Sequence, residues 1–277
     1  MRWLLLALLI GWLPSPVLHA VEAVDEAALH APFSRLLAAH VQWRADGSAS
    51  TVDYRGFARE RPALDAYLAA LSAISRAQFD AWPRASRQAF LINAYNGQTI
   101  ALVLGGGPEV RSIKQLGGWF SSPWQQRFFT LLGAERSLDE VEHTLLRGAA
   151  DFAEPRIHFA VNCASVGCPA LRHEAYVGAS LDAQLEDQTR RFLRDRRRNR
   201  IDAANGATGS AVLSKIFDWY ADDFEIGFRG AHSVQQFLAL YADVLAPGQE
   251  TVVRAALAAD ALSIDYGDYD WTLNRTP

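Results

Sequence analysis

The sequence predicts an α+β protein in which several helices pack around a small, mostly antiparallel sheet. Two observations support this fold class. Apolar residues recur at helical spacing through most of the chain, and only short runs, such as residues 51–54 and 156–163, have the β-branched and aromatic content of strands. A chain of 277 residues, half of them apolar, can bury a sizeable core. We expect residues 24–277 to form a single globular domain.

Residues 1–23 have the layout of a secretory signal peptide. An early charge, Arg2, precedes an apolar run over residues 3–13, and Ala20 and Ala23 offer two cleavage points. Eleven apolar residues are too few to span a bilayer, and no later apolar stretch is long and unbroken enough to do so. We therefore expect an exported, periplasmic protein that is soluble after cleavage, with an uncleaved N-terminal anchor as the alternative.

Charge and motifs exclude several functional classes. The formal net charge of −4 gives no general attraction to nucleic acid or anionic membrane, and the arginine-rich residues 194–200 are interpreted as a solvated face. The chain has no G-x-S-x-G elbow, phosphate-binding loop or H-E-x-x-H motif, which argues against serine hydrolases, nucleotide enzymes and zinc peptidases. We expect no cofactor and no metal.

Periodicity and capping residues give the expected elements in chain order. Helices are expected over residues 24–40, 64–73, 86–104, 138–147, 181–193 and 213–224, and extended pieces over residues 51–54, 156–163 and 199–202. The helix over 86–104, capped by Ser86, is apolar nearly all round and should be the buried centre of the fold. Ser137 and Glu140 form a capping box for the next helix. Residues 270–274 are expected to pack back on the core.

Four motifs together resemble one known family. They are Leu-Ile-Asn-Ala-Tyr-Asn at 91–96, the helix over 138–147 with its Glu-His pair, His-Phe-Ala-Val-Asn-Cys at 158–163 with Gly-Cys-Pro at 167–169, and Leu-Ser-Lys-Ile-Phe-Asp-Trp-Tyr at 213–220. In this order they are similar to the family called domain of unknown function 547, over roughly residues 52–224. The resemblance implies a fold and a cluster of polar positions, with the C-terminal extension packed on this core, but no substrate.

The residues favour a thiol-dependent hydrolase or acyl transferase acting on a peptide or an envelope component. A cysteine would attack an acyl carbon, and a histidine would take and return the proton. Cys168 is the preferred nucleophile, because Pro169 suggests that a helix begins there and its free N–H groups favour a thiolate. Cys163 ends the predicted strand that carries His158. Glu142 is expected to hold that histidine in the required tautomer.

Other polar side chains are candidates for substrate binding. Strand parity places His158 and Asn162 on one face. His143 points about 100° away from Glu142 along the helix, and we expect it to pair with Arg147 one turn later. The predicted substrate-binding residues are Asn93, Asn96, Asn162, His143, Lys215 and Trp219, with Lys215, Trp219 and Asp223 along one side of a single helix.

Less specific interpretations remain open for each of these residues. Cys163 and Cys168 are equally consistent with a structural disulfide in a tight turn, which would make the protein a non-catalytic envelope module that binds a small molecule or peptide. A pair that cycles between thiol and disulfide would make it a redox-responsive protein, although C-x4-C is not the usual motif. Asn93 and Asn96, on an apolar helix, must either bond to neighbouring backbone or line a pocket.

Overall fold

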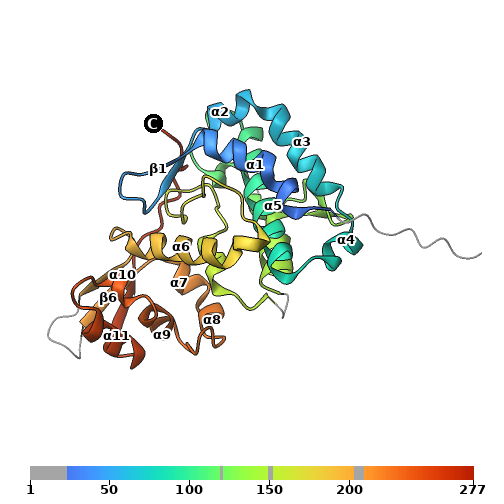
Figure 1. The fold of residues 1–277 in the computed structure, drawn as a ribbon. Coiled ribbons are helices and arrows are strands. Elements are labelled where there is room, and N and C mark those ends of the chain that lie inside the picture. Colours follow the sequence, from blue (N-terminus) through green and yellow to red (C-terminus); the bar gives the residue numbers. More distant parts are fainter. Residues whose placement is uncertain (1–23, 119–120, 149–151, 203–208) are drawn as a thin grey trace, which may run out of the picture.

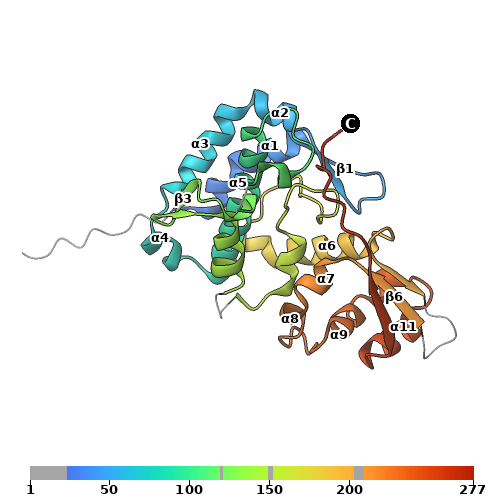
Figure 2. The same ribbon diagram turned by 180° about the vertical axis from the view of Figure 1, so that it is seen from behind.

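The computed structural model describes residues 24–118, 121–148, 152–202 and 209–277. Its architecture is α+β, as predicted: helices dominate, and the strands form small sheets in which most pairs are antiparallel (Figures 1 and 2). The predicted signal peptide, residues 1–23, lies outside the described residues. Among the described residues, no helix is long and apolar enough to cross a membrane.

The helical elements follow each other along the whole chain. The α-helices are α1 (Glu26–His40), α2 (Tyr54–Arg59), α3 (Arg61–Ser72), α4 (Arg76–Ala81), α5 (Arg84–Gly105), α6 (Leu181–Arg194), α7 (Ile216–Trp219), α8 (Ala221–Phe224), α9 (Val234–Ala239), α10 (Ala242–Leu245) and α11 (Glu250–Ala258). Shorter helical segments are η1 (Ile113–Leu116), η2 (Pro123–Gln125), η3 (Glu140–Leu146), η5 (Pro155–Phe159) and η6 (Gly178–Ser180).

The sheets are small and lie around the helices. Strands β1 (Val41–Trp43) and β2 (Ser50–Val52) form one antiparallel pair, and β3 (Phe129–Leu131) and β4 (Ala134–Arg136) form another. In the third sheet β6 (Gly209–Leu213) lies between β5 (Arg200–Asp202), which is antiparallel to it, and β7 (Leu262–Tyr266), which is parallel.

Helix α5 is the centre of the N-terminal half, as its apolar sequence predicts. Nearly every side chain from Gln88 to Ala101 is buried. It packs against α1, α2, α3 and η3, and these elements share one hydrophobic cluster. Figure 1 shows α5 surrounded by the blue, cyan and green helices of this half.

A second hydrophobic cluster fills the C-terminal half and is rich in phenylalanine. It gathers residues of α6 to α11 and the third sheet. Segment η5 joins the two clusters, since Ile157 packs in the first and Phe159 in the second. Phe159 stacks on Phe192 with ring centroids 4.9 Å apart. His158, between these two anchors, is therefore held at the junction of the two halves.

The segment around His158 is helical, and the predicted strand over 156–163 is wrong. Pro155 occupies the first turn of η5, and the Glu154 side chain accepts the Arg156 N–H at its N-terminus. Proline is favoured at that position because its missing N–H is not needed there. The apolar run that looked like a central strand is instead buried on all sides between the two clusters, a pattern that periodicity alone cannot distinguish from a strand.

The helix predicted over residues 213–224 is also interrupted. Leu213 ends β6, and the segment after it forms two short helices, α7 and α8, separated at Tyr220. Lys215, Trp219 and Asp223 consequently do not share one side of a continuous helix. The break turns Asp223 toward η3 and η5, where it becomes part of the candidate site.

Other local expectations have mixed outcomes. The capping box is present: the Ser137 hydroxyl accepts the Glu140 N–H at 3.1 Å, and Glu140 accepts the Ser137 N–H at 2.9 Å. The helix that follows is wound as a π-helix in η3. Ser86 is not the N-cap of α5, which begins after Pro83. No helix begins at Pro169, since the chain from there to Val177 is irregular.

The C-terminal residues return to the N-terminal half, as expected. Arg275 bridges Val52 of β2, and Leu273 bridges Ser165 in the loop between the two cysteines. The N–H of Gly167 donates to the carbonyl of Asp270 at 2.8 Å. Figures 1 and 2 show this dark red segment running from β7 back to β1. The returning chain places Tyr269 and Trp271 against the cysteine loop.

Candidate functional site

A cavity of about 250 Å³ lies at the junction of the two hydrophobic clusters. Its walls come from α5, η2, η3, η5, the cysteine loop, α7 and the C-terminal segment. The lining residues are Tyr95, Trp124, Asp139, Glu142, His143, His158, Val161, Cys163, Cys168, Pro169, Ile216, Trp219, Tyr220, Tyr269 and Trp271. Aromatic rings thus surround a few titratable groups and both sulfur atoms of the chain.

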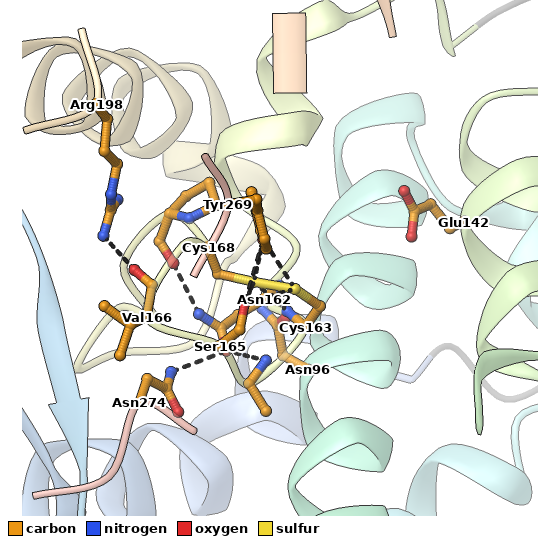
Figure 3. Close-up of a disulfide and its surroundings, with 12 residues drawn as sticks. Asn96, Glu142, Asn162, Cys163, Ser165, Val166, Cys168, Arg198, Tyr269 and Asn274 are labelled. Carbon is orange, nitrogen blue, oxygen red and sulfur yellow. Dashed lines mark hydrogen bonds between the residues drawn. A yellow bond between two sulfur atoms is a disulfide. The ribbon is translucent and has the colours of Figure 1, made fainter. Parts of the chain in front are cut away.

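The two cysteines form a disulfide in the wall of the cavity (Figure 3). Their Cα atoms are 6.2 Å apart. Three donors face the sulfur of Cys168: the Cys163 N–H at 2.9 Å, the Tyr269 hydroxyl at 3.2 Å and the Ser165 hydroxyl at 3.4 Å. Cys168 is buried, with 3% of its surface exposed, whereas Cys163 is partly exposed. The sulfurs therefore differ in both access and hydrogen bonding.

A carboxylate holds the ring of His158. Its Nε2 lies 2.6 Å from Oδ2 of Asp223, and Arg147 donates to both carboxylate oxygens of Asp223, at 2.6 and 3.1 Å. Burial raises the pKa of Asp223, but the bonds from His158 and Arg147 outweigh burial and hold that pKa well below its usual range. Because an ionised carboxylate only accepts hydrogen bonds, Nε2 must carry the proton.

The second ring nitrogen of His158 is left as an acceptor. Nδ1 is buried and has no hydrogen-bond partner among the described residues, and the whole side chain is only 2% exposed. The ring stacks on Tyr220 with centroids 4.0 Å apart, and Phe224 lies 5.8 Å away. His158 is thus a histidine with a fixed orientation and tautomer, and it is one of the residues that line the cavity.

Glu142 contacts tyrosines instead of His158. The Tyr220 hydroxyl donates to Glu142 Oε1 at 2.7 Å. Burial raises the pKa of Tyr220 and Tyr95 well above the usual value, and the charge of Glu142 raises both further. Figure 3 shows Glu142 on a neighbouring helix, to one side of the disulfide cluster. The role that we assigned to Glu142, orienting His158, belongs to Asp223 in this structure.

The cavity brings together six of the ten residues chosen from the sequence. These six are Glu142, His143, His158, Cys163, Cys168 and Trp219; Asn93, Asn96, Asn162 and Lys215 do not line it. The Arg147 guanidinium meets His143 Nδ1 at 2.8 Å, as its spacing predicts. Lys215 forms an ion pair with Asp218 at 3.0 Å.

Asn93 and Asn96 bond to backbone, as the alternative interpretation of these two residues describes, and Asn162 also bonds to backbone. Asn93 accepts the Tyr176 N–H at 2.9 Å and donates to the Tyr176 carbonyl at 2.7 Å. Asn96 similarly accepts the Asn162 N–H and donates to the Ala160 carbonyl. The Asn162 side chain donates to the Pro169 carbonyl and accepts the Ala164 N–H (Figure 3). These bonds fix the loops on either side of the disulfide.

Sequence reasoning missed Asp223, which contacts His158, and several residues that line the cavity. Asp223 was noted only for its helical spacing, and Tyr220, Tyr269 and Trp271 were not selected at all. The sequence offered one signal for Asp223, its place shortly after the Asp-Trp-Tyr motif of residues 218–220. Tyr269 and Trp271 reach the cavity only because the C-terminal segment folds back.

The described residues contain no cluster of three or more histidine, cysteine, aspartate or glutamate side chains arranged to hold a metal ion. The side chains that line the cavity offer two imidazoles, two cysteine sulfurs, two carboxylates and several aromatic rings.

Comparison with known proteins identifies the family alone. No curated protein and no solved structure matches the chain. Residues 79–193 match the family model described as "Protein of unknown function, DUF547". The matched range includes α5, η3, η5, the disulfide loop and α6, and thus His158, Glu142 and both cysteines, but ends before Asp223 and Tyr269. Residues 79–193 of the chain are therefore similar to the DUF547 family, which confirms over that range the resemblance seen in the sequence.

Proposed function

We propose that the protein is a thiol-dependent hydrolase or acyl transferase whose nucleophile is freed when the disulfide is opened. One observation carries the proposal: a histidine with a bare Nδ1, held by an ionised aspartate, lines the same cavity as two cysteine sulfurs. A nucleophile, a base and a group that orients the base are the three parts of covalent acyl transfer.

Cys168 is the proposed nucleophile. On opening of the disulfide, the Cys163 N–H and the Tyr269 and Ser165 hydroxyls would stabilise a thiolate at its sulfur. This support replaces the helix N-terminus that we expected at Pro169. Cys163, the more exposed sulfur, would be the one that a reducing thiol attacks first, since attack there releases the better stabilised thiolate.

The reaction follows from these roles. The Cys168 thiolate attacks the acyl carbon and forms a thioester, and the leaving amine or alcohol takes a proton from His158. His158 Nδ1 then removes a proton from water, or from a second acceptor molecule, which attacks the thioester and releases the thiolate. His158 holds the proton of the Cys168 thiol before acylation and returns a proton to the sulfur at the end of the cycle. Asp223 stabilises the imidazolium present before acylation and again after water or the acceptor has been deprotonated, and Arg147 keeps Asp223 ionised.

Trapping of the acyl intermediate tests this proposal. The protein is reduced with a small dithiol, desalted and mixed with p-nitrophenyl acetate, and the acetylated residue is located by mass spectrometry. We expect one acetyl group on Cys168 in the wild type, a much slower reaction in His158→Asn, and none in Cys168→Ser. Equal labelling of both cysteines, unchanged in His158→Asn, would contradict the proposal.

A non-catalytic binding module is the second candidate, and it is favoured by the closed disulfide. In that case the cysteine pair only fixes the loop over residues 163–168, and the cavity holds a ligand without reacting. A disulfide that resists dithiols under native conditions would support this candidate over the enzyme.

We further propose that the chain is exported. The support is the signal-peptide pattern over residues 1–23, together with a disulfide of the kind that persists in oxidising compartments. N-terminal sequencing of the protein expressed with its full leader should find a mature chain that begins just after Ala20 or Ala23. An intact Met1 in the accumulated protein would refute export by cleavage.

A further inference from the structure

The rim of the cavity is built from tryptophan and tyrosine rings. Tyr269 lies 4.6 Å from Trp271 and 4.8 Å from Trp219, measured between ring centroids, and Trp124 lies 5.6 Å from Trp271. Trp219 is 46% exposed, unusual for so large an apolar side chain. Indole and phenol faces carry partial negative charge and attract cations placed over them.

Two aromatic rings of the cavity wall, Trp271 and Tyr220, each already have a cationic side chain of the protein over one face. The Lys114 ammonium lies 3.8 Å from the ring centroid of Trp271, and the Arg147 guanidinium lies 4.9 Å from that of Tyr220. Neither cation is among the residues that line the cavity. The same rings therefore have faces that accept positive charge in this structure.

Two carboxylates add negative charge to the wall. Glu142 is 6% exposed and forms no ion pair within 4.0 Å among the described residues. Asp139 has only the His143 ring at 4.0 Å. The charge of Glu142 contributes to the raised pKa of Asp139, Tyr95, Tyr220 and Tyr269. The negative charge of Glu142 thus acts on four groups of the wall, and the charges of Arg147 and Arg198 oppose it at Tyr220 and Tyr269.

The wall offers acceptors to a ligand, alongside the indole N–H donors of Trp124, Trp219 and Trp271. The hydroxyls of Tyr220 and Tyr269 already donate to Glu142 and Cys168. His158 Nδ1 is an independent indication of a missing donor, because it is a buried acceptor without a described partner on a side chain that is 98% buried. A buried acceptor is costly unless a ligand or water satisfies it. An anionic ligand would face this wall unfavourably.

From these observations we propose that the cavity binds a primary ammonium group carried by the acyl substrate, such as a lysine side chain or the amino terminus of a peptide. The aromatic rim would surround the alkyl part and its charge, and Glu142 and Asp139 would accept its N–H groups. The cavity volume of about 250 Å³ is ample for such a group; a cavity of about 150 Å³ already holds a benzene molecule. This inference deepens the proposed function by naming a substrate class.

Calorimetric titration of the oxidised protein at low ionic strength tests the inference without any reaction at the thiols. The probes are butylammonium, butan-1-ol, butyrate and tetramethylammonium, which separate charge, shape and N–H donation. We expect butylammonium to bind about tenfold more tightly than each of the others. Equal or tighter binding of butan-1-ol, butyrate or tetramethylammonium would overturn the proposal.

Single substitutions test whether the ammonium group binds in this cavity. Glu142→Gln keeps an acceptor for the Tyr220 hydroxyl but removes the charge, and it should weaken butylammonium binding about tenfold. Asp222→Asn is the matched control, because Asp222 is an exposed carboxylate beside Asp223 that does not line the cavity; binding should stay within about twofold. Trp219→Leu, at an exposed position, provides a second variant if Glu142→Gln does not fold.

The two proposals fail separately. Loss of ammonium preference with intact acetylation of Cys168 would overturn the substrate class and leave the thiol enzyme standing. Ammonium binding without acetylation would overturn the enzyme and leave a binding module that takes cationic ligands.

Discussion

The Nε2 atom of His158 lies 2.6 Å from Oδ2 of Asp223. His158 stands between Ile157 of the first hydrophobic cluster and Phe159 of the second, and Asp223 precedes Phe224 of the second. His158 is fixed by η5, and Asp223 by the short helix α8. Arg147 of the η3 turn completes the link with two bonds to Asp223. This contact gives the imidazole one tautomer and makes its position depend on how the two halves of the fold meet.

The first prediction concerns the base. His158→Asn should slow acylation of the reduced protein by about 10²–10⁴-fold, the usual contribution of a positioned base. Asp223→Asn should also slow it, because an amide at this position can donate to Nε2 and favour the wrong tautomer. Stopped-flow release of p-nitrophenol measures both rates. His232→Asn, at an exposed histidine outside the cavity, is the control and should retain the wild-type rate.

The second prediction concerns stability and pH. The pKa of Asp223 is lower in the folded protein than its ordinary value of 3.8, so the stability that the carboxylate contributes is fully present above that value and is lost as the pH falls through the folded pKa. Asp223→Asn should cost about 1–3 kcal/mol of unfolding free energy at pH 7. Urea unfolding should show this difference narrowing below about pH 4; a constant difference down to pH 2 would argue against the ionised pair.

The sequence predicted the central helix and the cysteine loop, but not the partner of His158. Helix α5 was predictable because a helix that is apolar on nearly all sides must be buried. The capping box at Ser137 was predictable because it depends only on residues three positions apart. Asp223 could not be found in this way. Its role depends on the break at Tyr220, which turns the carboxylate away from the face that uninterrupted helical spacing would give it.

The strand predicted through His158 failed for a related reason. An apolar run that is buried on all sides has no periodicity by which a strand could be told from a helix. Here Pro155 in the first turn and the Glu154 side chain at the N-terminus stabilise a helical segment. The aromatic rim of the cavity could not be predicted from the sequence either. Tyr269 and Trp271 reach the cavity only because the C-terminal segment folds back onto residues far away in sequence.

The third prediction separates structural from functional polar residues. Asn96→Ala leaves two buried backbone groups without a partner, the Asn162 N–H and the Ala160 carbonyl. The unfolding free energy should fall by about 1–3 kcal/mol for each of them. Thr99→Val, on the same helix, removes a buried hydroxyl that has no described partner and should cost far less. Thermal unfolding compares the two. Equal losses would contradict the role of Asn96 in fixing the loop.

The fourth prediction is that the disulfide is dispensable for folding. Its two cysteines are five positions apart in the sequence, and the closure of so short a loop contributes only about 2 kcal/mol through chain entropy. The Cys163→Ser and Cys168→Ser double variant should therefore stay folded, with a modestly lower melting temperature. A variant that is unfolded at 25 °C by circular dichroism would show that the cysteine pair is a structural requirement.

The central claim is that His158 and its aspartate activate a thiol in this cavity, and the most direct test is the rate of alkylation against pH. Iodoacetamide is added to the dithiol-reduced protein at a series of pH values, and the modification of each cysteine is followed by mass spectrometry. The account predicts that Cys168 reacts rapidly below pH 7, with a profile shifted upward in His158→Asn. If both thiols react only as ordinary cysteines near pH 8.5, identically in wild type and variant, the claim is contradicted.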